Sequence, residues 1–340
     1  MTRRLAILAA LWLGVSAAQD AIIRGGVSLV DLLVTVRDKK GALLKDLSQS
    51  DFKILEEGKQ VEIRNFVRQS DLPLNIGVLV DISGSVVGKI PEERLAARKF
   101  FDDVLRPQDE AFVISFGRSA TLLQDTTGSK QKLQQALDEV QPDRLVSLPP
   151  DVVLAQFPGG GGRMPRGGQM PRFPLPGPAP RGRGPGTGPG RGGGGIQMGG
   201  TVLYDAVFLA ADEVLKPIAG RKVIILLTDG QDQGSRVTLS RAVEAAQKSD
   251  VIVYSIQVRS AMGRVVDSLD TLSTDTGGRV YRLDGKLDKI FAEISDELRS
   301  QYAVSFAPSF TDGGYHTVDV EMSNKNYKAQ ARKGYYGSRE

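Results

Sequence analysis

Between residues 74 and 298 the chain alternates short, almost continuous apolar runs with longer stretches in which apolar residues recur every three or four positions. The runs are typical of strands buried on both faces, and the longer stretches have the spacing of amphipathic helices. We expect strands at 74–81, 111–116, 222–228, 251–258 and 279–283, and helices at 91–104, 130–140, 202–215, 239–248, 265–272 and 287–298. This alternation predicts an α/β fold with a doubly wound, mostly parallel sheet, and 120–124 is expected to be a short edge strand.

On both sides of this region the pattern changes to short segments in which polar and apolar residues alternate. Segments at 27–36, 52–56 and 61–66, and again at 301–308, 316–322 and 328–336, read as strands. We therefore expect an N-terminal β module at 22–70, an α/β domain at 74–298 and C-terminal β strands at 299–338. Because the ends of a doubly wound domain commonly lie close together, one hypothesis inserts the α/β domain into a β-sandwich-like module built from both termini.

Residues 158–200 form an insert dominated by Gly, Pro and Arg, without apolar periodicity. Such a segment buries too little surface to offset its ordering entropy, so we expect it to be disordered. Taking away its six arginines and the two near the N-terminus turns the formal charge of +4 into −4. The basic character therefore belongs to the insert and not to a nucleic-acid-binding face.

The N-terminal residues 1–18 predict a secretory signal peptide. Arg3 and Arg4 precede an apolar stretch at 5–15, and small residues fit a cleavage site after Ala18. The stretch is short for a membrane span, so an uncleaved anchor is the alternative, and we expect no span in the mature chain. The chain has no cysteine, so it uses no disulfide. We expect a secreted or periplasmic bacterial protein.

Three short segments carry acids and hydroxyls at the ends of the predicted strands. The first strand runs into Asp81, Ser83 and Ser85, the segment 199–201 brings Thr201 to a helix start, and a later strand ends at Asp229. Ligands in open α/β sheets bind at the carboxyl ends of the strands. Carboxylates and hydroxyls supply only hard oxygens, which suit Mg²⁺, and Mn²⁺ accepts the same ligands.

Together these segments resemble the von Willebrand factor type A domain and its metal-ion-dependent adhesion site (MIDAS). The resemblance implies that one divalent cation is bound by Asp81, Ser83, Ser85, Thr201 and Asp229. It also implies an adhesion-type function, in which the cation captures an Asp or Glu of a protein partner. The segment 38–59 resembles the N-terminal region of bacterial von Willebrand A-related proteins, including a group found in Acidobacteria. The insert at 158–200 is the main departure from the family pattern.

Several alternatives remain open at this point. Thr201 could serve only as a helix N-cap, and Asp205 and Asp232 could either orient the metal loops or stabilise turns and helix ends. The cation could merely fix the loops of an assembly scaffold. The sequence offers few catalytic residues. It has one histidine, His316, which lies in the C-terminal β region, and no cysteine nucleophile or G-x-S-x-G motif. We expect no enzyme, with metal-assisted hydrolysis as the competing reading.

Overall fold

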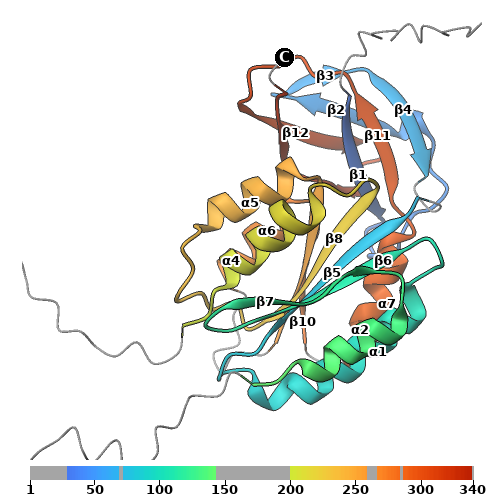
Figure 1. Ribbon diagram of the computed structural model, residues 1–340. Helices are drawn as coiled ribbons and strands as arrows, with labels where there is room; N and C mark the ends of the chain where they lie inside the picture. The colour runs from blue at the N-terminus through green and yellow to red at the C-terminus, as the bar shows by residue number, and fades with distance from the viewer. Residues whose placement is uncertain (1–28, 69–71, 143–199, 259–265, 284–285, 339–340) are drawn as a thin grey trace, which may run out of the picture.

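The computed structural model describes residues 29–68, 72–142, 200–258, 266–283 and 286–338 (Figure 1). The predicted signal peptide at 1–18 lies outside the described residues, as does nearly all of the insert at 158–200. Within the described ranges, no helix is both long and apolar enough to span a membrane.

The central sheet has the predicted α/β architecture. Its described strands follow the order β10-β9-β8-β5-β6-β7, parallel throughout except for β7, which pairs antiparallel with β6 at the edge. Their bounds are β5 Leu74–Asp81, β6 Glu110–Phe116, β7 Ala120–Thr127, β8 Arg221–Thr228, β9 Val251–Gln257 and β10 Val280–Arg282. The apolar strands β5 and β8 are neighbours at the centre and are buried along their whole length. The doubly wound, mostly parallel sheet is therefore confirmed.

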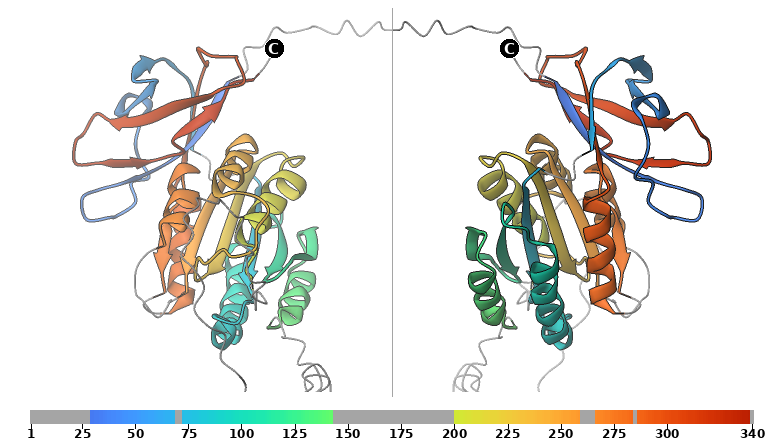
Figure 2. Two further views of the ribbon diagram at one scale, coloured as in Figure 1. Left: turned by 90° about the vertical axis from the view of Figure 1, so that its left-hand side faces the viewer. Right: turned by 90° about the vertical axis from the view of Figure 1, so that its right-hand side faces the viewer.

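Helices cover both faces of this sheet (Figures 1 and 2). One face packs against α1 (Ile90–Val104), α2 (Lys130–Glu139) and α7 (Leu287–Leu298), and the other against α4 (Leu203–Phe208), α5 (Leu239–Lys248) and α6 (Asp267–Asp275). Side chains of β5 alternate between the two cores, since Val78 and Val80 join one and Leu79 joins the other. The predicted helix at 202–215 starts as α4 and continues as a π-helical segment, η3 (Leu209–Leu215).

The flanking strands form two antiparallel sheets that mix both ends of the chain. Among the described residues their orders are β13-β1-β11-β4 and β14-β12-β2-β3. The strands are β1 Val30–Arg37, β2 Phe52–Glu56, β3 Lys59–Val61, β4 Ile63–Arg68, β11 Tyr302–Phe306, β12 Tyr315–Met322, β13 Lys328–Gln330 and β14 Gly334–Tyr336. Leu32, Phe52 and Tyr302 share one core. The expected β strands from both termini are confirmed, whereas the domain boundaries stay a prediction.

One strand prediction in this region is wrong. Residues 328–336 do not form one strand but two short ones, β13 and β14, in different sheets. The segment between them leaves the first sheet and pairs at Arg332 with Thr276 of the α/β domain. Each of the short strands then completes an edge of its sheet. An alternating pattern alone does not reveal where a strand changes partner.

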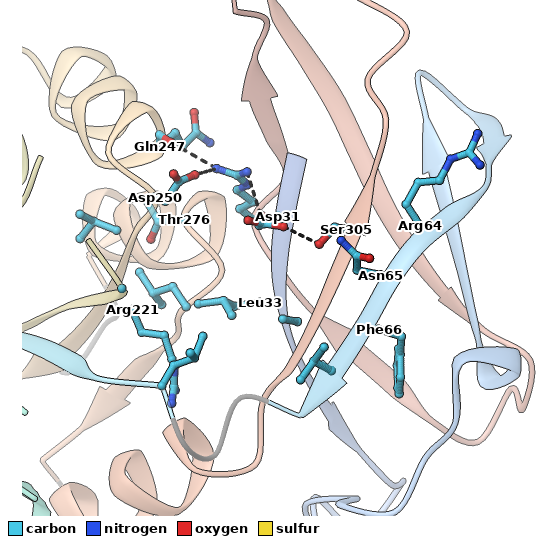
Figure 3. A pocket seen from close by; sticks show the side chains of 17 residues that line it. Asp31, Leu33, Arg64, Asn65, Phe66, Arg221, Gln247, Asp250, Thr276 and Ser305 are labelled. Atoms are coloured by element: carbon cyan, nitrogen blue, oxygen red, sulfur yellow. Dashed lines mark hydrogen bonds and ion pairs between the residues drawn. The ribbon is translucent and has the colours of Figure 1, made fainter. Parts of the chain in front are cut away.

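Polar side chains join the flanking sheets to the α/β domain. Arg332 donates to the Asp250 carboxylate at 2.5 Å and to the Asp31 carbonyl at 2.8 Å. A cavity of about 550 Å³ lies beside these contacts, lined by residues of both parts, such as Leu33 of the flanking sheets and Arg221 of the α/β domain (Figure 3). The two parts therefore meet through defined hydrogen bonds and not only through the chain.

A second junction centres on Glu297, which lies in α7 and is fully buried. Its carboxylate accepts hydrogen bonds from the Tyr254 hydroxyl at 3.0 Å, the Tyr281 hydroxyl at 3.1 Å and the Gln330 amide at 3.2 Å, and it forms an ion pair with Arg37. Burial, followed by the charge of Glu297, raises the pKa of Tyr254, so this hydroxyl stays protonated and donates. The end of α7 is thus bonded to strands β1 and β13 of the flanking sheets.

Candidate metal centre

Asp81 ends the central strand β5, and its side chain is held from two directions. The Ser83 amide donates to Asp81 Oδ1 at 2.8 Å, and the Thr228 hydroxyl donates to Asp81 Oδ2 at 2.6 Å. The residue is fully buried. Burial raises the pKa of Asp81, the hydrogen bonds from Ser83 and Thr228 oppose this rise, and the nearby charge of Asp229 adds to it. A buried acid therefore sits at the carboxyl end of the sheet.

The two serines follow in a tight loop that leads into α1. Their hydroxyl oxygens lie 3.1 Å apart, and the Val86 amide donates to the Ser83 carbonyl at 3.1 Å to close the turn. Ser83 is partly exposed and Ser85 exposed. The spacing of one residue thus brings both hydroxyls to the same side of the loop, next to Asp81.

Asp229 follows β8 directly and is almost fully buried. The Gln231 amide donates to Asp229 Oδ1 at 3.0 Å. Since β5 and β8 are paired in parallel, with Val80 opposite Leu227, their carboxyl ends are neighbours. This pairing explains why the Asp229 charge acts on Asp81.

Thr201 lies in the loop before α4. Hydrogen bonds join this loop to two other loops at the same end of the sheet. The Val202 amide donates to the Gly117 carbonyl at 2.8 Å, and the Gln233 amide donates to the Thr201 carbonyl at 3.0 Å. The N-cap of α4 is Val202, without a side-chain hydrogen bond, so the reading of Thr201 as a simple N-cap is wrong. Thr201 itself is buried, with 5 % of its surface exposed.

The loops that carry all five predicted residues therefore gather at one end of the sheet. The donor set consists of two carboxylates and three hydroxyls, all hard oxygens, which fits a small divalent cation such as Mg²⁺. Across the described ranges, no group of three or more Asp, Glu or His side chains lies close enough together to hold a metal. A cation here would accordingly depend on the hydroxyls as well as on the acids.

Asp205 and Asp232 tie the Thr201 loop to the loop after β8. Asp205 Oδ1 accepts the Arg236 amide at 2.9 Å and the Val237 amide at 2.8 Å. Asp232 Oδ1 accepts the Ser235 hydroxyl at 2.5 Å, and that hydroxyl oxygen also accepts the Tyr204 amide at 3.0 Å. Both acids thus stabilise turn and helix-end amides, and in doing so they fix two loops of the candidate centre relative to each other.

Glu93 is a residue near the centre whose position the sequence analysis missed. It lies in the first turn of α1, is 1 % exposed, and neither of its carboxyl oxygens has a hydrogen-bond partner among the residues that the structure describes. Burial, then the charges of Asp81 and Glu92, raise the pKa of Glu93 to about 8. The signal was present: Glu93 occupies the apolar stripe formed by Ile90 and Ala97, where a charge is unusual.

His316 lies away from the centre, in β12. Its Nε2 is 2.8 Å from Asp312 Oδ1, and its ring stacks on Phe310 with the centroids 4.2 Å apart. It is thus a bonded residue of the flanking sheets, and its place in the C-terminal β region agrees with the sequence pattern.

One family model matches a part of the chain. Residues 195–293 match the family model of the von Willebrand factor type A domain. No curated protein matches the chain in sequence.

Three solved structures are similar to parts of this chain. Proximal thread matrix protein 1 from the mussel byssus is 17 % identical, with 70 % of this chain and 49 % of that chain covered and a TM-score of 0.47. A structure of this mussel protein with a zinc-occupied MIDAS motif is 18 % identical, covering 70 % and 48 %, with a TM-score of 0.45. The conserved hypothetical protein BatB from Bacteroides thetaiotaomicron is 16 % identical, covering 66 % and 97 %, with a TM-score of 0.43. The chain spans about half the length of the mussel protein.

Proposed function

From the premise that the chain contains a von Willebrand factor type A domain, we propose that it is an exported protein-binding module whose bound divalent cation captures an acidic side chain of a partner. The residues that would hold the cation are Asp81, Ser83, Ser85, Thr201 and Asp229. When bound, the cation supplies a Lewis-acidic position for the partner's carboxylate.

The observation that carries this proposal is the buried negative charge at the end of β5 and β8. Asp81 and Asp229 are 0 % and 3 % exposed, and the charge of Asp229 acts on Asp81. Within the described part of the chain, neither carboxylate forms an ion pair with a basic side chain, although buried charges are normally paired or coordinate a metal. A divalent cation would neutralise both acids and would use the two hydroxyls 3.1 Å apart as neutral ligands.

The donor chemistry favours Mg²⁺, with Mn²⁺ as a substitute. All five side chains offer oxygen, whereas Zn²⁺ is bound mostly by cysteine sulfur and histidine nitrogen. The carboxylates of Asp81 and Asp229 balance the charge of one divalent ion, and the three hydroxyl ligands are neutral. These ligands therefore do not over-neutralise the cation, which would still attract an incoming Asp or Glu. Glutamine or asparagine on the partner would bind more weakly.

Binding, and not catalysis, is the function that these residues support best. A hydrolase would need a general acid or base that reaches a substrate beside the cation. The one histidine is bonded to Asp312 in the flanking sheets, and Asp205 and Asp232 are engaged in fixing loops. Export is the part of the proposal that rests on the N-terminal sequence, and mass spectrometry of the secreted chain tests it: a mature N-terminus at Gln19 is expected, and retention of residues 1–18 would contradict it.

The function is tested by loading the protein with Mn²⁺ and measuring water-proton relaxation. Water ligands that exchange on the bound ion give an enhancement, and acetate, as a mimic of an Asp or Glu side chain, is expected to reduce it by displacing a water. Acetamide has the same shape without the charge and should leave the enhancement unchanged.

Asp81→Ala and Ser83→Ala are expected to show no enhancement. An enhancement that acetate does not change would contradict carboxylate capture and would support the scaffold reading, in which the cation only fixes the loops. No enhancement in the unchanged protein would contradict the cation site itself.

A further inference from the structure

We propose that the Glu93 carboxylate lies beside the proposed cation site. There it accepts hydrogen bonds from water ligands of the cation and strengthens cation binding. This inference rests on the proposed function and assigns a residue that the MIDAS resemblance does not include. Glu93 is therefore a positioning residue for the site's water, and not a direct ligand.

Glu93 lies close to the candidate ligands along the chain. Helix α1 starts at Ile90, five residues after Ser85, so its first turn lies just beyond the loop of the candidate ligands. The inward stripe of α1 includes Ile90, Ala97, Phe100 and Val104, and Glu93 is its only charged member among the described residues. Within that stripe, Glu93 lies near the end of the helix that is closest to Asp81 in the chain, and the charge of Asp81 acts on it.

The unpaired carboxyl group of Glu93 also has an energetic consequence. A buried carboxyl group whose two oxygens lack hydrogen bonds carries a desolvation cost, because water solvates the group in the unfolded chain. A leucine at this position would continue the apolar stripe at no such cost. Glu93 thus destabilises the metal-free fold, and the cost is offset if a cation and its waters fill the space beside it. Burial is the largest cause of the rise of the Glu93 pKa to about 8, followed by the charge of Asp81.

The mode of contact follows from the carboxylate arrangement. Asp81, Asp229 and Glu93 do not form a group that could hold a metal on their own, since no such group of three occurs in the ranges described. Mg²⁺ dehydrates reluctantly and keeps several waters in protein sites. A carboxylate one water away from the ion still orients that water and adds negative charge. Replacing such an outer residue typically lowers metal affinity about 10–100-fold.

The test is a Mg²⁺ titration by calorimetry, combined with the thermal stability of the metal-free protein. Glu93→Gln is expected to bind Mg²⁺ at least about tenfold more weakly, while its metal-free unfolding midpoint, measured at pH 9 where Glu93 is charged, rises because that buried charge has been removed. A purely structural role would move both quantities downwards. This opposite sign separates the two roles. Glu93→Leu should show the same pair of effects and serves if the Gln variant folds poorly.

Glu92→Gln is the matched control. Glu92 is the preceding residue, is exposed, and pairs with Lys89 at 3.1 Å, so its variant should bind Mg²⁺ within about twofold of the unchanged protein. Normal Mg²⁺ affinity in Glu93→Gln, with binding lost in Asp81→Ala, would overturn the role of Glu93 and leave the proposed function standing. Failure of the unchanged protein to bind Mg²⁺ would overturn both.

Discussion

The buried acid at the end of α7 allows a quantitative prediction about how the α/β domain is joined to the flanking sheets. Glu297→Gln preserves the size of the side chain but removes its charge. The Arg37 guanidinium then loses its ion-pair partner, and the amide cannot accept from Tyr254, Tyr281 and Gln330 as the carboxylate does. The perturbation is thus confined to one junction between α7 and strands β1 and β13.

The size of the effect follows from the burial of the two partners. Breaking a buried ion pair by removing one partner costs about 3–5 kcal/mol. The Arg37 side chain is 19 % exposed, whereas that of Glu297 is fully buried. Because Arg37 can turn partly towards water, the loss belongs at the lower end, about 3 kcal/mol. For a domain of this size, that corresponds to a fall of roughly 6–12 °C in the unfolding temperature.

Urea unfolding followed by circular dichroism measures this loss, and a double-mutant cycle with Arg37→Met isolates the ion pair. Arg37→Met is also expected to destabilise, because it leaves the buried Glu297 without its cation, and the double variant should lose less than the sum of the two. Asp103→Asn removes an exposed partner of Lys99 and should leave the unfolding midpoint unchanged. A loss below about 1 kcal/mol for Glu297→Gln, or strict additivity in the cycle, would show that the buried ion pair does not stabilise this junction.

Three further predictions concern the core, the loops and pH. Gly77→Ala places a Cβ 2.3 Å from the buried ring of Phe112 and should lower stability by about 1–3 kcal/mol in thermal unfolding. In the control Gly84→Ala the added Cβ meets no atom within 4 Å, so stability should not change. Equal unfolding midpoints for the two variants would contradict a steric clash at Gly77. Asp205→Ala leaves the Arg236 and Val237 amides without their acceptor and should cost about 1–3 kcal/mol in urea unfolding; an unchanged midpoint would show that the loop has other support. Since the pKa of Glu93 is raised from 4.5 to about 8, the folded chain binds this proton more tightly than the unfolded chain, and the metal-free protein should lose stability as pH rises from about 4.5 to 8. Glu93→Gln should make the free energy of unfolding depend less on pH over this range. The same pH dependence in both proteins would contradict a raised pKa at Glu93.

Much of the fold was predictable because the hydrophobic pattern of the α/β domain is strong. The apolar runs that become β5 and β8 have no competing reading, and their carboxyl ends meet because parallel neighbours end at the same edge. The placement of Asp81 and Asp229 at that edge follows from these two facts. The pattern of the flanks was weaker, which explains why the division of 328–336 into β13 and β14 was missed.

The parts that could not be predicted depend on side chains meeting across long distances in the chain. Arg37 and Glu297 are 260 residues apart, and nothing local in either segment indicates the other. Glu93 is a different case, since its position on an apolar stripe was visible. Acids in the first turn of a helix are usually favourable surface residues, so the position of Glu93 in that turn does not by itself indicate burial.

The most direct test of the central claim is a Mg²⁺ titration by calorimetry in metal-stripped buffer, comparing the unchanged protein with Asp81→Ala and with Asp319→Ala, which removes an exposed acid of β12. A cation site at the end of β5 predicts saturable binding at one site in the unchanged protein and in Asp319→Ala, and none in Asp81→Ala. Equal binding by all three proteins, or binding by none, would contradict a cation site at the end of β5.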